Sequence, residues 1–154
     1  MNRHPLNLTA RSSTIAESTL PELLRLHGPQ MLVVEDDWDL EPLVRRAAGS
    51  LSPAVAVDWC TSAEHARRLL ADRYYDVVLA DYVLEGGNSG LALRADCWTF
   101  QPQAIFAMTS SYPLTEYLHS VGRPGCPFLA KPFDVWTCRR FVESLLARDG
   151  GANS

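Results

Sequence analysis

The sequence contains no run of apolar residues that approaches the length of a membrane span, so no transmembrane helix is expected. Arg3 and His4 near the N-terminus are not followed by the apolar stretch of a secretory signal. Basic residues are in the minority, because 14 Lys and Arg stand against 18 Asp and Glu and leave a net charge of −4. Duplex-DNA binding requires a basic face. We therefore expect no direct contact with nucleic acid or membrane.

Cysteines are few and stand far apart, with no CxxC pair and no histidine at zinc-finger spacing. They are Cys60, Cys97, Cys126 and Cys138. This pattern indicates free thiols in a reducing compartment and predicts a cytoplasmic protein. A chain of 154 residues with 47% apolar and 21% charged residues can bury a sizeable core without a disulfide or a structural metal.

The first 29 residues differ in composition from the rest of the chain. Residues 1–29 form a predicted N-terminal extension, a polar tail with a short helix at 20–27 that begins at the capping box Thr19–Glu22. Such a helix is too short to be stable alone. Residues 30–148 are predicted to form one domain, and residues 149–154 a disordered tail.

Short apolar runs alternate with helical patterns from residue 30 onward. The runs are Met31–Val34, Ala54–Val57, Val77–Ala80, Ala104–Met108 and Phe128–Ala130. They are apolar throughout instead of alternating, which is typical of parallel strands buried on both faces. The chain is therefore predicted to be an α/β protein, a three-layer α/β/α sandwich around a five-stranded parallel sheet.

Five helices are predicted between and after these runs. They are Trp38–Leu51 with Pro42 in its first turn, a helix from the capping box Thr61–Glu64 through Ala71, Gly90–Cys97, Pro113–Val121, and a helix capped by Asp134 that runs to about Arg148. Trp38, Trp59, Trp98 and Trp136 are predicted to be packing residues, and Asp37 a helix N-terminal acid.

Carboxylate, hydroxyl and ammonium groups that suit one site follow the first, third, fourth and fifth apolar runs. Glu35, Asp36 and Asp37 follow the first run, Asp81 the third, Thr109 the fourth and Lys131 the fifth. Ligands of open α/β sheets bind at the carboxyl ends of the strands, so these groups are expected to converge.

A carboxylate cluster with a hydroxyl and an ammonium group suits phosphoryl transfer. Mg²⁺ prefers hard oxygen ligands and needs only one or two carboxylates beside a phosphate oxygen. A lysine and a hydroxyl then stabilise the remaining phosphoryl oxygens, and a carboxylate is able to act as the nucleophile. The sequence therefore predicts a Mg²⁺-dependent phosphoryl-transfer site.

The order and placement of these groups resemble those of response-regulator receiver domains, across residues 30 to about 148. The resemblance rests on Leu-Val-Val-Glu35-Asp36-Asp37, Val-Val-Leu-Ala-Asp81, Ala-Met-Thr109-Ser110 and Phe-Leu-Ala-Lys131-Pro132-Phe133. It implies a flavodoxin-like, doubly wound sheet with strand order 2-1-3-4-5.

The resemblance also implies a role for each site residue. Asp81 would be the phosphoacceptor, and Mg²⁺ would be held by Asp36, by Glu35 mainly through water, by Asp81 and by the backbone carbonyl of Val83.

Further residues would contact the phosphoryl group or move in response to it. Lys131 would pair with the phosphoryl group, and Thr109 would donate its hydroxyl to it. Phe128 occupies the aromatic switch position, and Pro132 is expected to follow a cis peptide bond. The chain departs from the family in the loop 82–90, which lacks a proline at position 85 and is one residue longer.

The function that the resemblance implies is a phosphoacceptor in a two-component system. The phosphoryl donor would be a sensor histidine kinase or a histidine phosphotransfer protein, and the output an unidentified protein contacted through a switched face. A homodimer remains open, and the only chemistry expected is self-phosphorylation and autodephosphorylation at Asp81.

Two alternatives remain. One is a phosphate-independent interaction module, against which the intact acceptor, acid pair and lysine argue. The other is a Mg²⁺-dependent phosphatase with an aspartyl nucleophile. That class places a second acid two residues after the nucleophile, where this chain has Val83.

Overall fold

The computed structural model describes residues 27–87, 89–112 and 126–148. Three predicted segments lie outside the described residues: the N-terminal extension up to residue 26, the helix Pro113–Val121 and the tail 149–154. Among the described helices, none has both the length and the apolar character needed to cross a bilayer.

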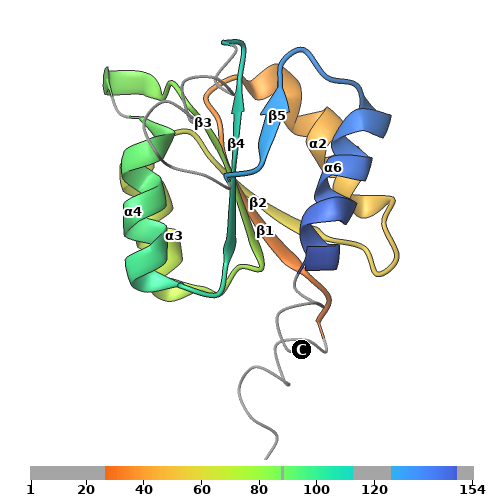
Figure 1. Cartoon of the computed structure of the whole chain (residues 1–154), viewed down its shortest axis with the longest axis horizontal. Coiled ribbons are helices and arrows are strands. Elements are labelled where there is room, and N and C mark those ends of the chain that lie inside the picture. The colour runs from red at the N-terminus through yellow and green to blue at the C-terminus, as the bar shows by residue number, and fades with distance from the viewer. Residues whose placement is uncertain (1–26, 88, 113–125, 149–154) are drawn as a thin grey trace, which may run out of the picture.

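The described part of the chain is built on one open sheet of five parallel strands in the order β2-β1-β3-β4-β5 (Figure 1). The strands are β1 (Gln30–Val34), β2 (Ala56–Cys60), β3 (Val77–Asp81), β4 (Ile105–Ser110) and β5 (Phe128–Ala130). This confirms the predicted parallel sheet and its strand order.

Helices cover both faces of the sheet and complete the predicted three layers. They are α2 (Glu41–Gly49), α3 (Ala63–Asp72), α4 (Gly90–Phe100) and α6 (Val135–Arg148), with 3₁₀ turns η1 (Trp38–Leu40) and η2 (Glu85–Gly87). Figure 1 shows α3 and α4 on one face and α2 and α6 on the other.

Two apolar clusters lie on opposite faces of the sheet because successive side chains of a strand point to opposite sides. In β1, Leu32 and Val34 belong to the cluster under α3 and α4, whereas Met31 and Val33 belong to the cluster under α2 and α6. All five residues of β3 are buried. The central strands therefore form a rigid base whose carboxyl ends carry the acidic residues.

Several predicted boundaries were wrong. The second strand is Ala56–Cys60 instead of Ala54–Val57. It lies at the edge of the sheet and is only partly buried, so it includes the polar Asp58 and is not apolar throughout. The predicted helix Trp38–Leu51 is divided into η1 and the shorter α2.

The remaining shifts concern caps and the ends of elements. Asp37 caps η1 by accepting from the Asp39 amide at 3.0 Å, in keeping with its predicted role. Ser62, one residue after the predicted capping threonine, is the N-cap of α3. The helix predicted as Gly90–Cys97 continues to Phe100, and β4 includes Thr109 and Ser110. The prediction that Asp134 caps the last helix is confirmed by a 2.7 Å bond from the Thr137 amide.

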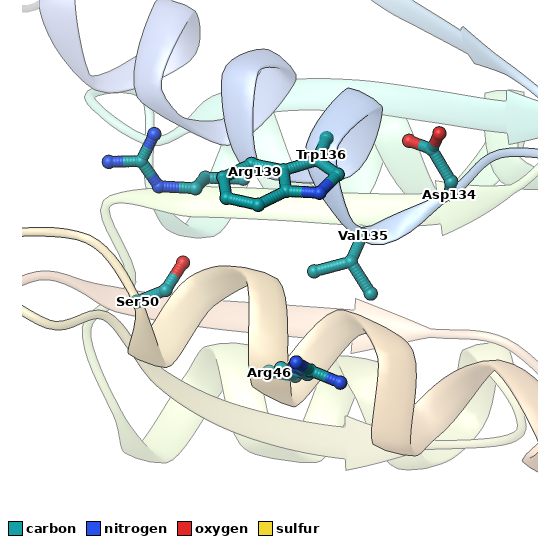
Figure 2. A pocket seen from close by; sticks show the side chains of 6 residues that line it. All are labelled: Arg46, Ser50, Asp134, Val135, Trp136 and Arg139. Atoms are coloured by element: carbon teal, nitrogen blue, oxygen red, sulfur yellow. The ribbon is translucent and has the colours of Figure 1, made fainter.

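Three of the four tryptophans predicted to be packing residues lie outside the core, although Trp38 contacts the Trp59 ring and Trp98 lies against Arg94. Trp38, Trp98 and Trp136 are exposed, since each lies on the solvent side of its helical turn. Trp136 lines a cavity of about 620 Å³ between α2 and the start of α6, together with Arg46 and Arg139 (Figure 2). The residues that line this cavity do not include any of the acidic residues described below.

Candidate functional site

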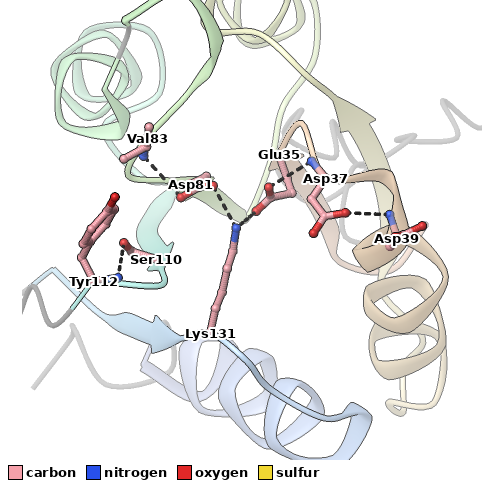
Figure 3. Close-up of polar contacts among 8 residues, drawn as sticks. All are labelled: Glu35, Asp37, Asp39, Asp81, Val83, Ser110, Tyr112 and Lys131. Atoms are coloured by element: carbon pink, nitrogen blue, oxygen red, sulfur yellow. Dashed lines mark hydrogen bonds and ion pairs between the residues drawn. The ribbon is translucent and has the colours of Figure 1, made fainter.

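The predicted site residues gather at the carboxyl ends of the central strands (Figure 3). Glu35 follows β1 directly, and Asp81 is the last residue of the neighbouring β3. Asp81 is paired in register with Thr109 of β4, so the acid and the hydroxyl residue lie on adjacent strands. The parallel register thus brings together residues that are 46 and 28 positions apart in the chain.

Lys131 joins the two buried acids. Its Nζ lies 2.6 Å from Glu35 Oε2 and 2.8 Å from Asp81 Oδ2, and it donates a hydrogen bond to the latter. The Lys131 amide donates to the Ser110 carbonyl at 2.9 Å, which continues the β4–β5 pairing up to the lysine. The Lys131–Pro132 peptide bond is cis, as predicted. The ammonium therefore reaches the acidic residues from the end of β5.

Burial and the two ion pairs act on the pKa of Lys131 in opposite directions. Loss of solvent lowers the pKa of the ammonium, but the hydrogen bonds and charges of Asp81 and Glu35 outweigh this effect and raise it above its ordinary value. Lys131 is therefore fully charged at neutral pH.

Glu35, Asp36 and Asp81 form a cluster able to hold a cation. One carboxylate oxygen from each lies within 4.8 Å of the others. Glu35 is only 1% exposed, and its desolvation raises its pKa from 4.5 to about 7, with the Asp81 charge acting in the same direction and Lys131 opposing it. Oxygen-only donors with one solvent-exposed carboxylate, Asp36, fit a hydrated Mg²⁺ ion. A cation there would offset the burial and the Asp81 charge that disfavour an ionised Glu35.

Thr109 places a buried hydroxyl on the strand next to that of Asp81. The residue is 2% exposed, and its Oγ1 has no hydrogen-bond partner among the residues that the structure describes. Leaving a buried polar group unpaired costs about 1–3 kcal/mol. A buried donor next to Asp81 is thus available to an oxygen atom brought into the site.

The loop after Asp81 turns back on the site. The Val83 amide donates to Asp81 Oδ1 at 3.3 Å, and Val83 pairs with Ser89 in an isolated antiparallel bridge. The predicted role of the Val83 carbonyl as a metal ligand stays a prediction. Sequence reasoning gave no role to Ser89 or Gly90, although a serine followed by glycine at a helix start was a visible signal of a cap.

Phe128 and Ser110 lie on the neighbouring strands β5 and β4. Phe128 is half-buried against the cluster under α3 and α4, and its predicted switch role remains to be tested. Ser110 Oγ accepts from the Tyr112 amide at 3.0 Å, which sets the direction of the chain leaving β4 (Figure 3).

Comparison with solved structures identifies the fold of the chain. A response regulator from Thermotoga maritima superposes with a TM-score of 0.65 at 22% identity, over 77% of this chain and 98% of that one. A CheY-like response regulator receiver domain protein from Methanospirillum hungatei gives a TM-score of 0.68 at 15% identity, over 79% and 96%. The fold is that of response-regulator receiver domains. In this chain, Glu35 and Asp81 stand at the carboxyl ends of β1 and β3 of that fold.

Sequence comparison gives weaker support. No protein-family model matches the chain. Protein PetR of Rhodobacter capsulatus is 26% identical over 120 residues, which are 78% of this chain and 49% of PetR. The chain thus spans about half the length of this curated relative.

Proposed function

We propose that this chain is a phosphoacceptor receiver domain of a two-component system, with Asp81 as the residue that takes the phosphoryl group. The observation that carries the proposal is the arrangement around Asp81. Its carboxylate is paired with Lys131 at 2.8 Å, and the Thr109 hydroxyl on the adjacent strand has no hydrogen-bond partner among the described residues. A charged donor and an unused neutral donor thus flank one nearly buried carboxylate.

The chemistry that these groups suit is attack by a carboxylate on phosphorus. An Asp81 oxygen forms the new O–P bond as the N–P bond of a phosphohistidine breaks, and the imidazole nitrogen retains the electron pair. The product is an acyl phosphate. Lys131 neutralises part of the added charge, and the Thr109 hydroxyl donates to a phosphoryl oxygen.

Glu35, Asp36 and Asp81, with the Val83 carbonyl, would hold Mg²⁺. Such an ion supplies charge neutralisation and orients the phosphoryl oxygens. Its binding also lets Glu35 ionise near neutral pH, because an adjacent cation offsets the burial that raises the pKa of this acid to about 7.

The phosphoryl group would act as a switch through the residues that meet it. Movement of Thr109 and Lys131 towards the new charge changes the ends of β4 and β5, and Phe128 at the start of β5 turns inward. A partner that binds only this form shifts the population by its difference in affinity. The donor in this proposal is a histidine kinase or a histidine phosphotransfer protein in the cytoplasm, and the output partner is a protein.

The proposal is tested by incubating the protein with acetyl phosphate and Mg²⁺ and measuring its intact mass. We expect one added phosphoryl group on the wild type and none on Asp81→Asn. Asp39→Asn is the matched control, because Asp39 is an exposed acid in η1 close to the cluster and should leave the adduct intact. Folded wild-type protein that takes up no phosphoryl group, or an adduct that persists in Asp81→Asn, would refute the assignment.

A further inference from the structure

The backbone of Gly90 lies directly against the peptide group of the acceptor residue. Gly90 is the first residue of α4, and it is buried. A Cβ placed on it would lie 2.6 Å from the Asp81 carbonyl oxygen, 3.3 Å from the Asp81 carbonyl carbon and 3.5 Å from the Tyr82 Cα. These neighbours are backbone atoms, which cannot rotate away as the end of a side chain can. The start of α4 therefore approaches Asp81 as closely as a residue without a side chain permits.

Hydrogen bonds hold this contact from both sides. The Gly90 amide donates to the Tyr82 carbonyl at 3.0 Å, and the Tyr82 amide donates to the Thr109 carbonyl at 2.9 Å. Tyr82, the residue after Asp81, is thus held through its carbonyl by the start of α4 and through its amide by strand β4. A displacement on the α4 side would be transmitted to the acceptor instead of being absorbed.

Val83, which follows Tyr82, and Ser89, which precedes Gly90, extend the contact between the loop after Asp81 and the start of α4. Val83 and Ser89 pair in an antiparallel bridge, and Ser89 is the N-cap of α4, accepting from the Ala92 amide at 3.4 Å. The Val83 amide in turn donates to Asp81 Oδ1 at 3.3 Å. The position of the loop residue predicted to offer its carbonyl to a metal therefore depends on where α4 begins.

We propose that Gly90 is a positioning residue for the cation site, with Ser89 in support. In this inference, which rests on the proposed function, the start of α4 sets the relative positions of the Asp81 carboxylate and the Val83 carbonyl. Mg²⁺ demands near-ideal octahedral geometry, so a shift of a few tenths of an ångström between two of its oxygen ligands weakens binding. A side chain at residue 90 forces such a shift.

The test measures Mg²⁺ binding to the full chain by isothermal titration calorimetry, with circular dichroism to establish folding. Gly90→Ala should weaken Mg²⁺ binding by about tenfold or more, the range found when groups that support metal ligands are changed. Gly49→Ala is the matched control. Gly49 also lies in a helix, but a Cβ there meets no atom within 4 Å, so its Mg²⁺ affinity should equal that of the wild type.

A second pair of variants decides the question if Gly90→Ala does not fold. Ser89 and Ser62 cap α4 and α3 in the same way, and both helices cover the same face of the sheet. Ser89→Ala and Ser62→Ala should lower the unfolding midpoint alike, but only Ser89→Ala should weaken Mg²⁺ binding.

A wild type that binds no Mg²⁺ would refute the proposed function and the inference together. A wild type that binds Mg²⁺ while folded Gly90→Ala binds it equally well would overturn the inference alone. Where Gly90→Ala is unfolded, equal Mg²⁺ affinity of the two serine variants would overturn it in the same way.

Discussion

Replacing Glu35 with glutamine should stabilise the metal-free protein at neutral pH while it removes one carboxylate of the proposed cation cluster. Glu35 is 1% exposed, and desolvation raises its pKa from 4.5 to about 7 despite the ion pair with Lys131. Between these values the folded protein holds a proton on Glu35 that the unfolded chain has released. The stability of the wild type therefore falls as the pH rises from about 4.5 to 7.

The size of the effect follows from this interval. A pH unit corresponds to about 1.4 kcal/mol, so the interval from 4.5 to about 7 corresponds to about 3 kcal/mol. The Glu35→Gln variant lacks this titration. It should match the wild type near pH 4, exceed its free energy of unfolding by about 1 kcal/mol at pH 5, and exceed it by about 3 kcal/mol at pH 7 and above.

Urea unfolding with a chelator present, at pH values from 4 to 8, measures this difference. Glu64→Gln is the matched control, because Glu64 is an exposed partner of Arg68 on α3 and its change should stay within about 0.5 kcal/mol. Added Mg²⁺ should stabilise the wild type at pH 8 and have little effect on Glu35→Gln. A Glu35→Gln variant that is less stable than the wild type at pH 8, or that keeps the same pH dependence, would refute the reasoning.

Three further predictions concern residues around the site and the core. Lys131→Ala should lose about 3 kcal/mol of unfolding free energy at pH 8, because two buried carboxylates lose their counterion. It should still accept a phosphoryl group but fail to bind an output partner, and unchanged partner binding would count against this role. Thr109→Val should keep or slightly increase the stability of the unmodified protein, since no bond to a described residue is lost, yet weaken beryllofluoride binding. A decrease of more than about 1 kcal/mol in the unfolding free energy of the unmodified variant would show that the Thr109 hydroxyl makes a hydrogen bond in the wild type. Gln101→Leu should cost about 3 kcal/mol in urea unfolding, because the Gln101 side chain accepts from the Tyr75 amide at 2.9 Å and donates to the Leu70 carbonyl at 2.7 Å. A cost below about 1 kcal/mol would show that these bonds are dispensable.

The central strands and the site at their ends could be predicted from the sequence because both depend on local pattern. A strand buried on both faces is apolar throughout, so β1 and β3 were visible as runs, and the acids directly after them marked the carboxyl ends. The convergence of Glu35, Asp81 and Lys131 then followed from the parallel order of the strands.

The features that could not be predicted depend on partners distant in the chain. The edge strand β2 includes Asp58, which is satisfied by the Tyr75 hydroxyl at 2.7 Å and by Arg73 at 3.0 Å. Gln101 is buried only because it joins the ends of α3 and α4 through backbone groups some 26 to 31 residues away. No local periodicity indicates either arrangement.

The polar end of β4 is a feature of the site that the local sequence pattern did not predict. Thr109 and Ser110 were expected to follow the strand because the apolar run ends at Met108. Both are in the strand and buried, since they pair with β3 and β5 up to the level of Asp81 and Ala130.

A crystal structure of the protein with Mg²⁺ and beryllofluoride tests the central claim most directly. We expect the fluoride adduct on Asp81 and the ion at about 2.1 Å from Asp36, Asp81 and the Val83 carbonyl. Lys131 Nζ and Thr109 Oγ1 should each donate to a fluorine. An ion bound elsewhere, or an adduct that neither Lys131 nor Thr109 contacts, would contradict the account.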